Sequence, residues 1–221
     1  MKPLFTLAAA LLLPVLAHAQ NETSLSVAKV PLRADAPMLF APRGWKIEKQ
    51  INGDLNRDKI SDAALVLVEN RPAKDAEGIA TARNRALVVV LREGKGFRRA
   101  GFNNSLLLGT RDGGAFYGVV ETPVSVSIAR GVLLVNQDSG SRATYETTHK
   151  FRLDRRTQRF YLIGFDSIEN DRLSGETTSQ STNFLTGRQE IRRYLQSSDS
   201  FKTTKSRVSR KLQLLEATRR D

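Results

Sequence analysis

Oxygen-bearing side chains recur at short, regular intervals in the segment 53–62. Counting from Asp54, they stand at positions 1, 3, 5 and 9 of a loop, and a backbone carbonyl is available at position 7. A loop with this spacing curls so that alternate groups point inward and form an oxygen cage for a hard cation. Oxygen ligands favour calcium or magnesium over zinc or copper, and a flexible cage suits calcium better. The spacing predicts a weak, structural calcium site with five ligands: Asp54, Asn56, Asp58, the carbonyl of Ile60, and Asp62.

Two residues set this loop apart from a standard calcium loop. Position 12 is Leu65, so the bidentate glutamate of an EF-hand is missing. Position 6 is Lys59, at a place where the chain often needs a positive φ angle. A side chain in that conformation costs on the order of 1 kcal/mol, and the ammonium group opposes a bound cation. The alternative is a turn in which Asp and Asn side chains accept hydrogen bonds from nearby backbone amides.

Residues suited to catalysis are few. Apart from His18, the one histidine is His149, and it shares its side of a predicted strand with apolar residues, which favours a structural role. There is no cysteine, so thiolate chemistry and disulfides are excluded. We find no catalytic residue set and predict a non-catalytic binding or structural module. The alternative is a carboxylate-dependent hydrolase acting on cell-envelope polymers, since two acidic side chains suffice for that reaction.

Basic residues outnumber acidic ones, giving a formal net charge of +12. Such an excess favours polyanionic partners over specific nucleic-acid recognition, for which no motif is present. Two groups near predicted turns, together with Arg188 and the basic segment 202–220, are candidates for binding an anionic envelope surface of lipid phosphate or acidic glycan. The alternative is a solvated basic surface without a ligand. The candidate anion-binding residues are Arg155, Arg156, Arg159, Arg192 and Arg193.

The first nineteen residues have the pattern of a cleaved signal peptide. Lys2 precedes an apolar run over Leu4–Leu16, and Ala17 and Ala19 supply the small residues that signal peptidase requires. The run is shorter than the ~20 residues of a transmembrane helix, and no other segment is apolar enough to span a bilayer. We therefore expect a periplasmic or secreted protein, cleaved after Ala19, without a transmembrane segment.

The elements that must position these residues are strands. Alternating or continuous apolar runs over 45–51, 63–68, 86–91 and 124–165, followed by a hairpin over 177–195, predict an all-β domain at 45–195. Residues 20–44 are expected to form an extended leader. Residues 196–221 are expected to form a basic polar tail, in which 206–218 fits a short amphipathic helix and 211–215 fits an edge strand.

The segment from Gly53 to Val68, with Arg85–Phe97 behind it, resembles a single FG-GAP or VCBS-type repeat, the calcium-loop unit of integrin-like β-propellers. The resemblance implies a calcium loop leading into an apolar strand, within a hairpin unit at 45–100 that an antiparallel meander continues over 101–195. Later segments, such as Asn183–Gly187, are similar to a family of small exported bacterial β-rich proteins of unassigned function. With one repeat detectable, a complete propeller does not fit within the chain.

Overall fold

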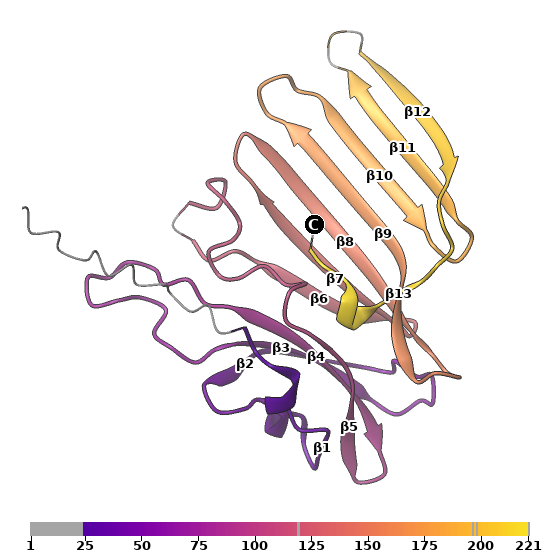
Figure 1. Ribbon diagram of the computed structural model, residues 1–221. Coiled ribbons are helices and arrows are strands. Elements are labelled where there is room, and N and C mark those ends of the chain that lie inside the picture. The colour runs from indigo at the N-terminus through magenta and orange to yellow at the C-terminus, as the bar shows by residue number, and fades with distance from the viewer. Residues whose placement is uncertain (1–23, 119, 196, 198, 221) are drawn as a thin grey trace, which may run out of the picture.

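The structure is a computed structural model that describes residues 24–118, 120–195, 197 and 199–220, so the expected signal peptide lies outside it. The described chain is all-β, as predicted, with thirteen strands in two antiparallel sheets (Figure 1). Its helical elements are three short 3-10 turns: η1 (Val27–Lys29), η2 (Pro37–Phe40) and η4 (Leu215–Ala217).

The two sheets follow one another along the chain. The first sheet, in spatial order, contains β1 (Arg33–Ala34), β5 (Gly96–Asn103), β4 (Arg85–Glu93), β3 (Asp62–Glu69) and β2 (Trp45–Gly53). The second sheet contains β12 (Ser200–Arg207), β11 (Arg188–Leu195), β10 (Thr177–Asn183), β9 (Arg159–Asp171), β8 (Ala143–Asp154), β7 (Val132–Gly140) and β6 (Val124–Ala129). A short additional strand, β13 (Gln213–Leu214), pairs with β9. Because neighbouring strands from β6 to β12 are consecutive in sequence, the predicted meander is present.

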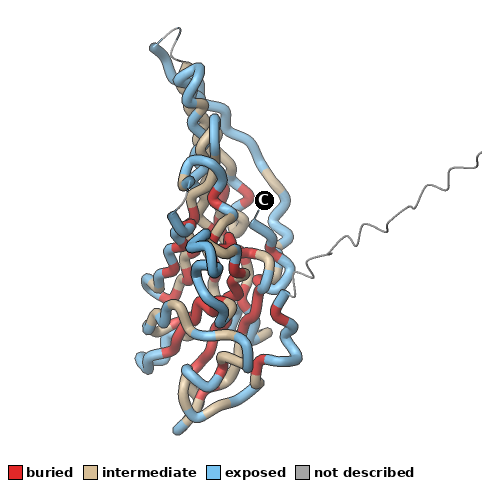
Figure 2. Tube along the Cα trace, turned by 90° about the vertical axis from the view of Figure 1, so that its left-hand side faces the viewer, coloured by how far each residue is buried: buried red, intermediate tan, exposed pale blue. Residues whose placement is uncertain are grey.

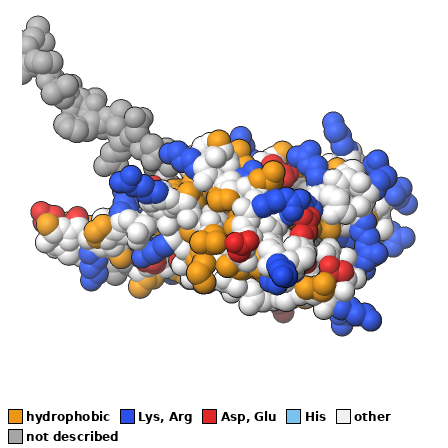
Figure 3. Space-filling model, turned by 90° about the horizontal axis from the view of Figure 1, so that it is seen from below, with side chains coloured by type: hydrophobic (Ala, Val, Ile, Leu, Met, Phe, Trp, Pro, Cys, Tyr) orange, Lys and Arg blue, Asp and Glu red, His pale blue; other side chains and the backbone are white. Residues whose placement is uncertain are grey.

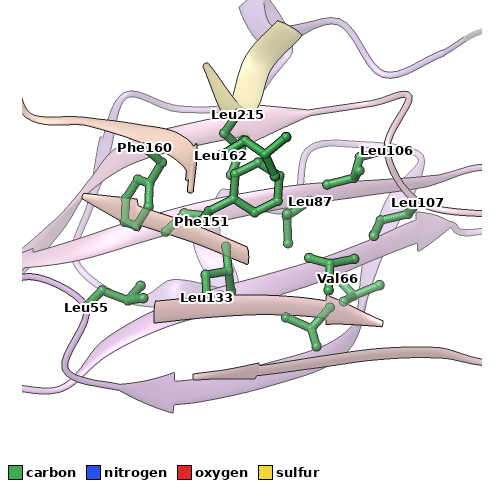
Figure 4. Close-up of a cluster of buried hydrophobic side chains, with 14 of the residues drawn as sticks. Leu55, Val66, Leu87, Leu106, Leu107, Leu133, Phe151, Phe160, Leu162 and Leu215 are labelled. Carbon is green, nitrogen blue, oxygen red and sulfur yellow. The ribbon is translucent and has the colours of Figure 1, made fainter. Parts of the chain in front are cut away.

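The main core lies between the two sheets (Figure 4). The first sheet contributes residues such as Val66 and Leu87, and the second contributes residues such as Leu133 and Phe151. All four side chains are fully buried. Removing them from water is the main force that holds the sheets together.

A second core covers the opposite face of the first sheet. Alternate residues of β3 and β4, such as Leu65 and Val88, face away from the main core and pack against Leu25, Val30 and Phe40. These three N-terminal side chains are at most 3% exposed. The described part of the expected leader, residues 24–44, therefore belongs to the folded domain. The reason is physical: β3 and β4 are apolar on both faces, and both faces need cover.

The expected polar tail also belongs to the fold. Residues 200–207 form β12, and the edge-strand alternative for the C-terminal region is confirmed over Gln213–Leu214. Leu215 then enters the main core, and the Asn103 side-chain amide donates to the carbonyls of Leu215 and Thr218 at 2.6 and 2.7 Å. These contacts explain why residues 213–218 do not form the alternative amphipathic helix.

Strands β10, β11 and β12 extend beyond the first sheet as a thin upper layer, which we call the platform (Figures 1 and 2). Thr182 is its only buried residue, and every residue of β12 is exposed. Residues paired directly across antiparallel strands share a face of the sheet. The buried His149 pairs with Phe165, and Phe165 pairs with Thr182. These residues therefore lie on one face of the sheet, which we call the core-side face of the platform. Its outer face carries the alternate residues.

Candidate functional site

The predicted calcium loop connects β2 to β3, and its last residue, Asp62, is 1% exposed. One Asp62 carboxylate oxygen accepts hydrogen bonds from the backbone N–H groups of Leu55 and Asn56, at 2.8 and 3.3 Å. The other accepts from the backbone N–H of Arg92, at 2.8 Å. Burial raises the pKa of Asp62, and these three hydrogen bonds act in the opposite direction. Asp62 thus fastens the loop to β4.

The other side chains of the loop are brought together as a turn. The two carboxylate oxygens of Asp54 accept from the backbone N–H groups of Asp58 and Lys59, at 3.1 and 2.9 Å. Asp58 accepts from the backbone N–H of Ile60 at 2.7 Å, and the Asn56 amide donates to Asp58 at 2.8 Å. Within the described residues, no group of three or more acidic, histidine or cysteine side chains has an arrangement that could hold a metal ion.

The backbone of the loop is curled as its spacing predicts. Lys59 has a φ of 71°, which confirms the positive angle expected at position 6, and Arg57 has a φ of 64°. Arg155 donates a hydrogen bond to the Asn56 carbonyl at 3.1 Å, so a guanidinium group lies against the loop. The oxygen donors of Asp54, Asn56 and Asp58 fit calcium in chemical type. The nearby cations and the engagement of Asp62 with the backbone both oppose tight binding.

His149 lies on β8 and is 2% exposed. Its ring packs 4.9 Å from Phe165 and 6.3 Å from Phe151, and burial lowers its pKa to about 4 despite a hydrogen bond with the Arg219 backbone. In the described part of the chain its Nδ1 has no hydrogen-bond partner. The ring borders a cavity of about 260 Å³ that Leu162 and Phe184 also line. Among the described residues, the cavity beside this ring contains no carboxylate that could orient it.

Carboxylates do not converge in four cavities whose lining residues all belong to the described part of the chain. One of about 680 Å³ has Glu190 as its one acidic lining residue, and two others have Asp112 and Asp54 respectively. The cavity beside His149 contains none. A glycoside hydrolase of the usual kind needs two carboxyl groups about 5–10 Å apart.

The predicted anion-binding arginines fall into two separate places. Arg155, Arg156 and Arg159 lie at the turn between β8 and β9, where Arg159 is 3.5 Å from Glu216. Arg192 and Arg193 lie on β11, on opposite faces of the sheet. Arg192 pairs with Ser179 of β10, which pairs with Ile168 of β9. Ile168 is nine positions along β9 from Arg159, or about 30 Å at 3.3–3.4 Å per residue. The structure does not bring the two groups together.

The register reveals a further basic cluster. Arg188 of β11 lies directly opposite Arg207 of β12, and the next outer-face pair is Glu190 with Lys205, 3.7 Å apart. The sequence interpretation placed Lys205 and Arg207 in a tail, so their alignment with Arg188 was not predicted. The signal that favours a strand there is Phe201 with the two threonines that follow it, because these residue types are enriched in strands.

No family model, curated protein or solved structure matches this chain. Among the described residues, no helix has the length and apolar character needed to cross a membrane.

Proposed function

We propose that this protein is an exported, non-catalytic binding module whose platform contacts an anionic partner at the cell envelope. The platform is the observation that supports this proposal. Its three strands order their backbone while burying one residue, so the packing of a core does not explain why they are there. Residues 186–211 contain eight basic and two acidic residues, an excess that attracts polyanions.

Retention on an immobilised polyanion tests this function. Replacing Arg192 and Arg193 by Glu reverses the charge at one position on each face of the platform. The salt concentration needed to elute the protein should then be much lower than for the wild type. Reversing Arg155 and Arg156 to Glu is the matched control, because it makes the same change in net charge at the β8–β9 turn. Equal losses in the two variants would show that net charge alone governs retention.

We further propose that the 54–62 loop of this binding module is a weak calcium site with a structural role. The supporting observation is the curled backbone, around which the side chains of Asp54, Asn56 and Asp58 gather and accept hydrogen bonds from the loop's own amides. Asp62 completes the predicted ligand set, although its oxygens already accept three backbone hydrogen bonds. Calcium that binds the folded state more tightly than the unfolded chain raises its stability.

Melting curves test the calcium site. Millimolar calcium should raise the melting temperature of the wild-type protein relative to chelator, and Asp58→Asn should abolish that rise. The Asn carbonyl can still accept the hydrogen bond from the Ile60 amide, so the apo variant should stay folded. Glu77→Gln removes one exposed carboxylate from another loop and is the matched control. A calcium response that survives in Asp58→Asn would rule out this ligand set.

A further inference from the structure

The outer face of the platform carries two guanidinium groups in direct opposition. Arg188 and Arg207 are register partners on adjacent antiparallel strands, where Cβ atoms lie about 4.5–5.5 Å apart. Like charges at directly opposed positions destabilise a sheet. Among the described residues, neither arginine forms an ion pair with a carboxylate, because the nearest outer-face acid, Glu190, faces Lys205. An anion between the two arginines would remove this repulsion.

The surroundings of the two arginines are concave and polar. Both line the cavity of about 680 Å³, whose other outer-face residues carry hydroxyl, amide and charged groups: Ser181, Asn183, Glu190 and Lys205. Arg210 is held close to this end of the platform, since its Nε donates to the Leu185 carbonyl at 2.9 Å. Guanidinium groups match phosphate oxygens in bidentate geometry, so the chemistry of this groove suits a phosphate group.

Aromatic residues occupy the other end of the same face. Phe201 is 65% exposed, its ring lies 5.0 Å from the Tyr194 ring, and the Arg192 guanidinium is 5.4 Å from its centroid. Tyr194 is six positions along β11 from Arg188, which corresponds to about 20 Å along the strand. An exposed aromatic ring beside cationic side chains is typical of protein surfaces that rest in the headgroup region of a membrane.

We propose that the outer face of β11 and β12 docks on an anionic phospholipid surface. Arg188 and Arg207 bind a lipid phosphate, Lys205 adds to the local positive charge, and Phe201 enters the headgroup layer. Seen from below, Lys and Arg side chains gather toward the right-hand end of the molecule (Figure 3). Because the arginines and the phenylalanine share one face of a thin sheet, they can meet a flat surface together. This inference rests on the proposed anion-binding function of the platform.

Vesicle sedimentation tests the docking face. Wild-type protein should bind vesicles of about 30% phosphatidylglycerol in phosphatidylcholine, and bind pure phosphatidylcholine far less, since anionic headgroups attract the basic residues near the surface. Arg188→Glu with Arg207→Glu should weaken this binding about tenfold or more. Arg193→Glu with Lys202→Glu is the matched control, because this directly opposed pair lies on the core-side face. The vesicle binding of this control variant should weaken by less than about threefold.

Phe201→Ala should weaken vesicle binding while leaving retention on a polyanion column unchanged, which separates lipid docking from charge attraction alone. Equal losses in the two double variants would overturn the assignment to the outer face. Binding of an acidic polysaccharide, or stabilisation by inorganic phosphate, without vesicle binding would overturn the lipid surface as the partner. Each of these results leaves the proposed function standing. Failure to bind any polyanion would refute the proposed function as well.

Discussion

His149 is an ionisable residue in a buried environment that disfavours its charged form. An imidazole in water has a pKa of about 6.5, whereas burial lowers the pKa of His149 to about 4. Between these two values the unfolded chain binds a proton that the folded protein does not. The contribution of His149 to stability is therefore fully present above about pH 6.5 and is lost as the pH falls toward 4.

We predict that wild-type protein loses about 2 kcal/mol of its free energy of unfolding between pH 7 and pH 5 through this residue alone. His149→Phe keeps a flat ring among Phe151 and Phe165 and has no proton to bind. Urea unfolding at the two pH values should therefore show a smaller loss in the variant than in the wild type. Losses of the same size would mean that other groups cause the pH dependence.

At the scale of elements, the central strands β3 and β4 follow from their composition. Runs over 63–68 and 86–91 contain mainly Ala, Val and Leu, so they were predicted as strands covered on both faces, and the structure has them so. The cover over one face was not predicted. Leu25, Val30 and Phe40 lie in a segment with several prolines, and no periodicity marks them as core residues.

An ion pair between a buried arginine and a partly buried glutamate joins these elements to the connection between the sheets. Arg85 of β4 is 4% exposed, and its Nε and Nη2 each donate to a different carboxylate oxygen of Glu48 on β2, both at 2.7 Å. Its Nη1 donates to the carbonyls of Leu108 and Thr122, at 3.1 and 2.8 Å. The arginine thereby links both ends of the segment that connects β5 to β6.

We predict that Glu48→Ala lowers the free energy of unfolding by about 3 kcal/mol, because it leaves a buried guanidinium without its counter-charge. Arg142→Ala breaks the Arg142–Asp171 ion pair, in which the arginine side chain is 68% exposed, and should cost far less stability because water screens that pair. Urea unfolding of the two variants gives the comparison. If both variants lose equally little, the Glu48–Arg85 pair does not hold the connection in place.

At the scale of the whole molecule, the all-β class, the meander and the loop position were predictable because local patterns specify them. The turn at Gly187, with a φ of 68°, and the hairpin around it are examples. The basic cluster of the platform was not predictable in the same way. Whether Arg188 faces Arg207 depends on the register between two strands, and 200–207 has neither apolar alternation nor a marked turn before it.

The return of residues 213–218 to the core has a consequence for how the protein forms during synthesis. Hairpins such as β6–β7 and β10–β11 join residues close in sequence and can pair as soon as they are made. The hydrogen bonds from Asn103 to the carbonyls of Leu215 and Thr218, however, can form only after more than a hundred further residues have been added. The main core also lacks Leu215 until then. We therefore expect the main core between the two sheets to stay incomplete in a growing chain until residues 213–218 have been made.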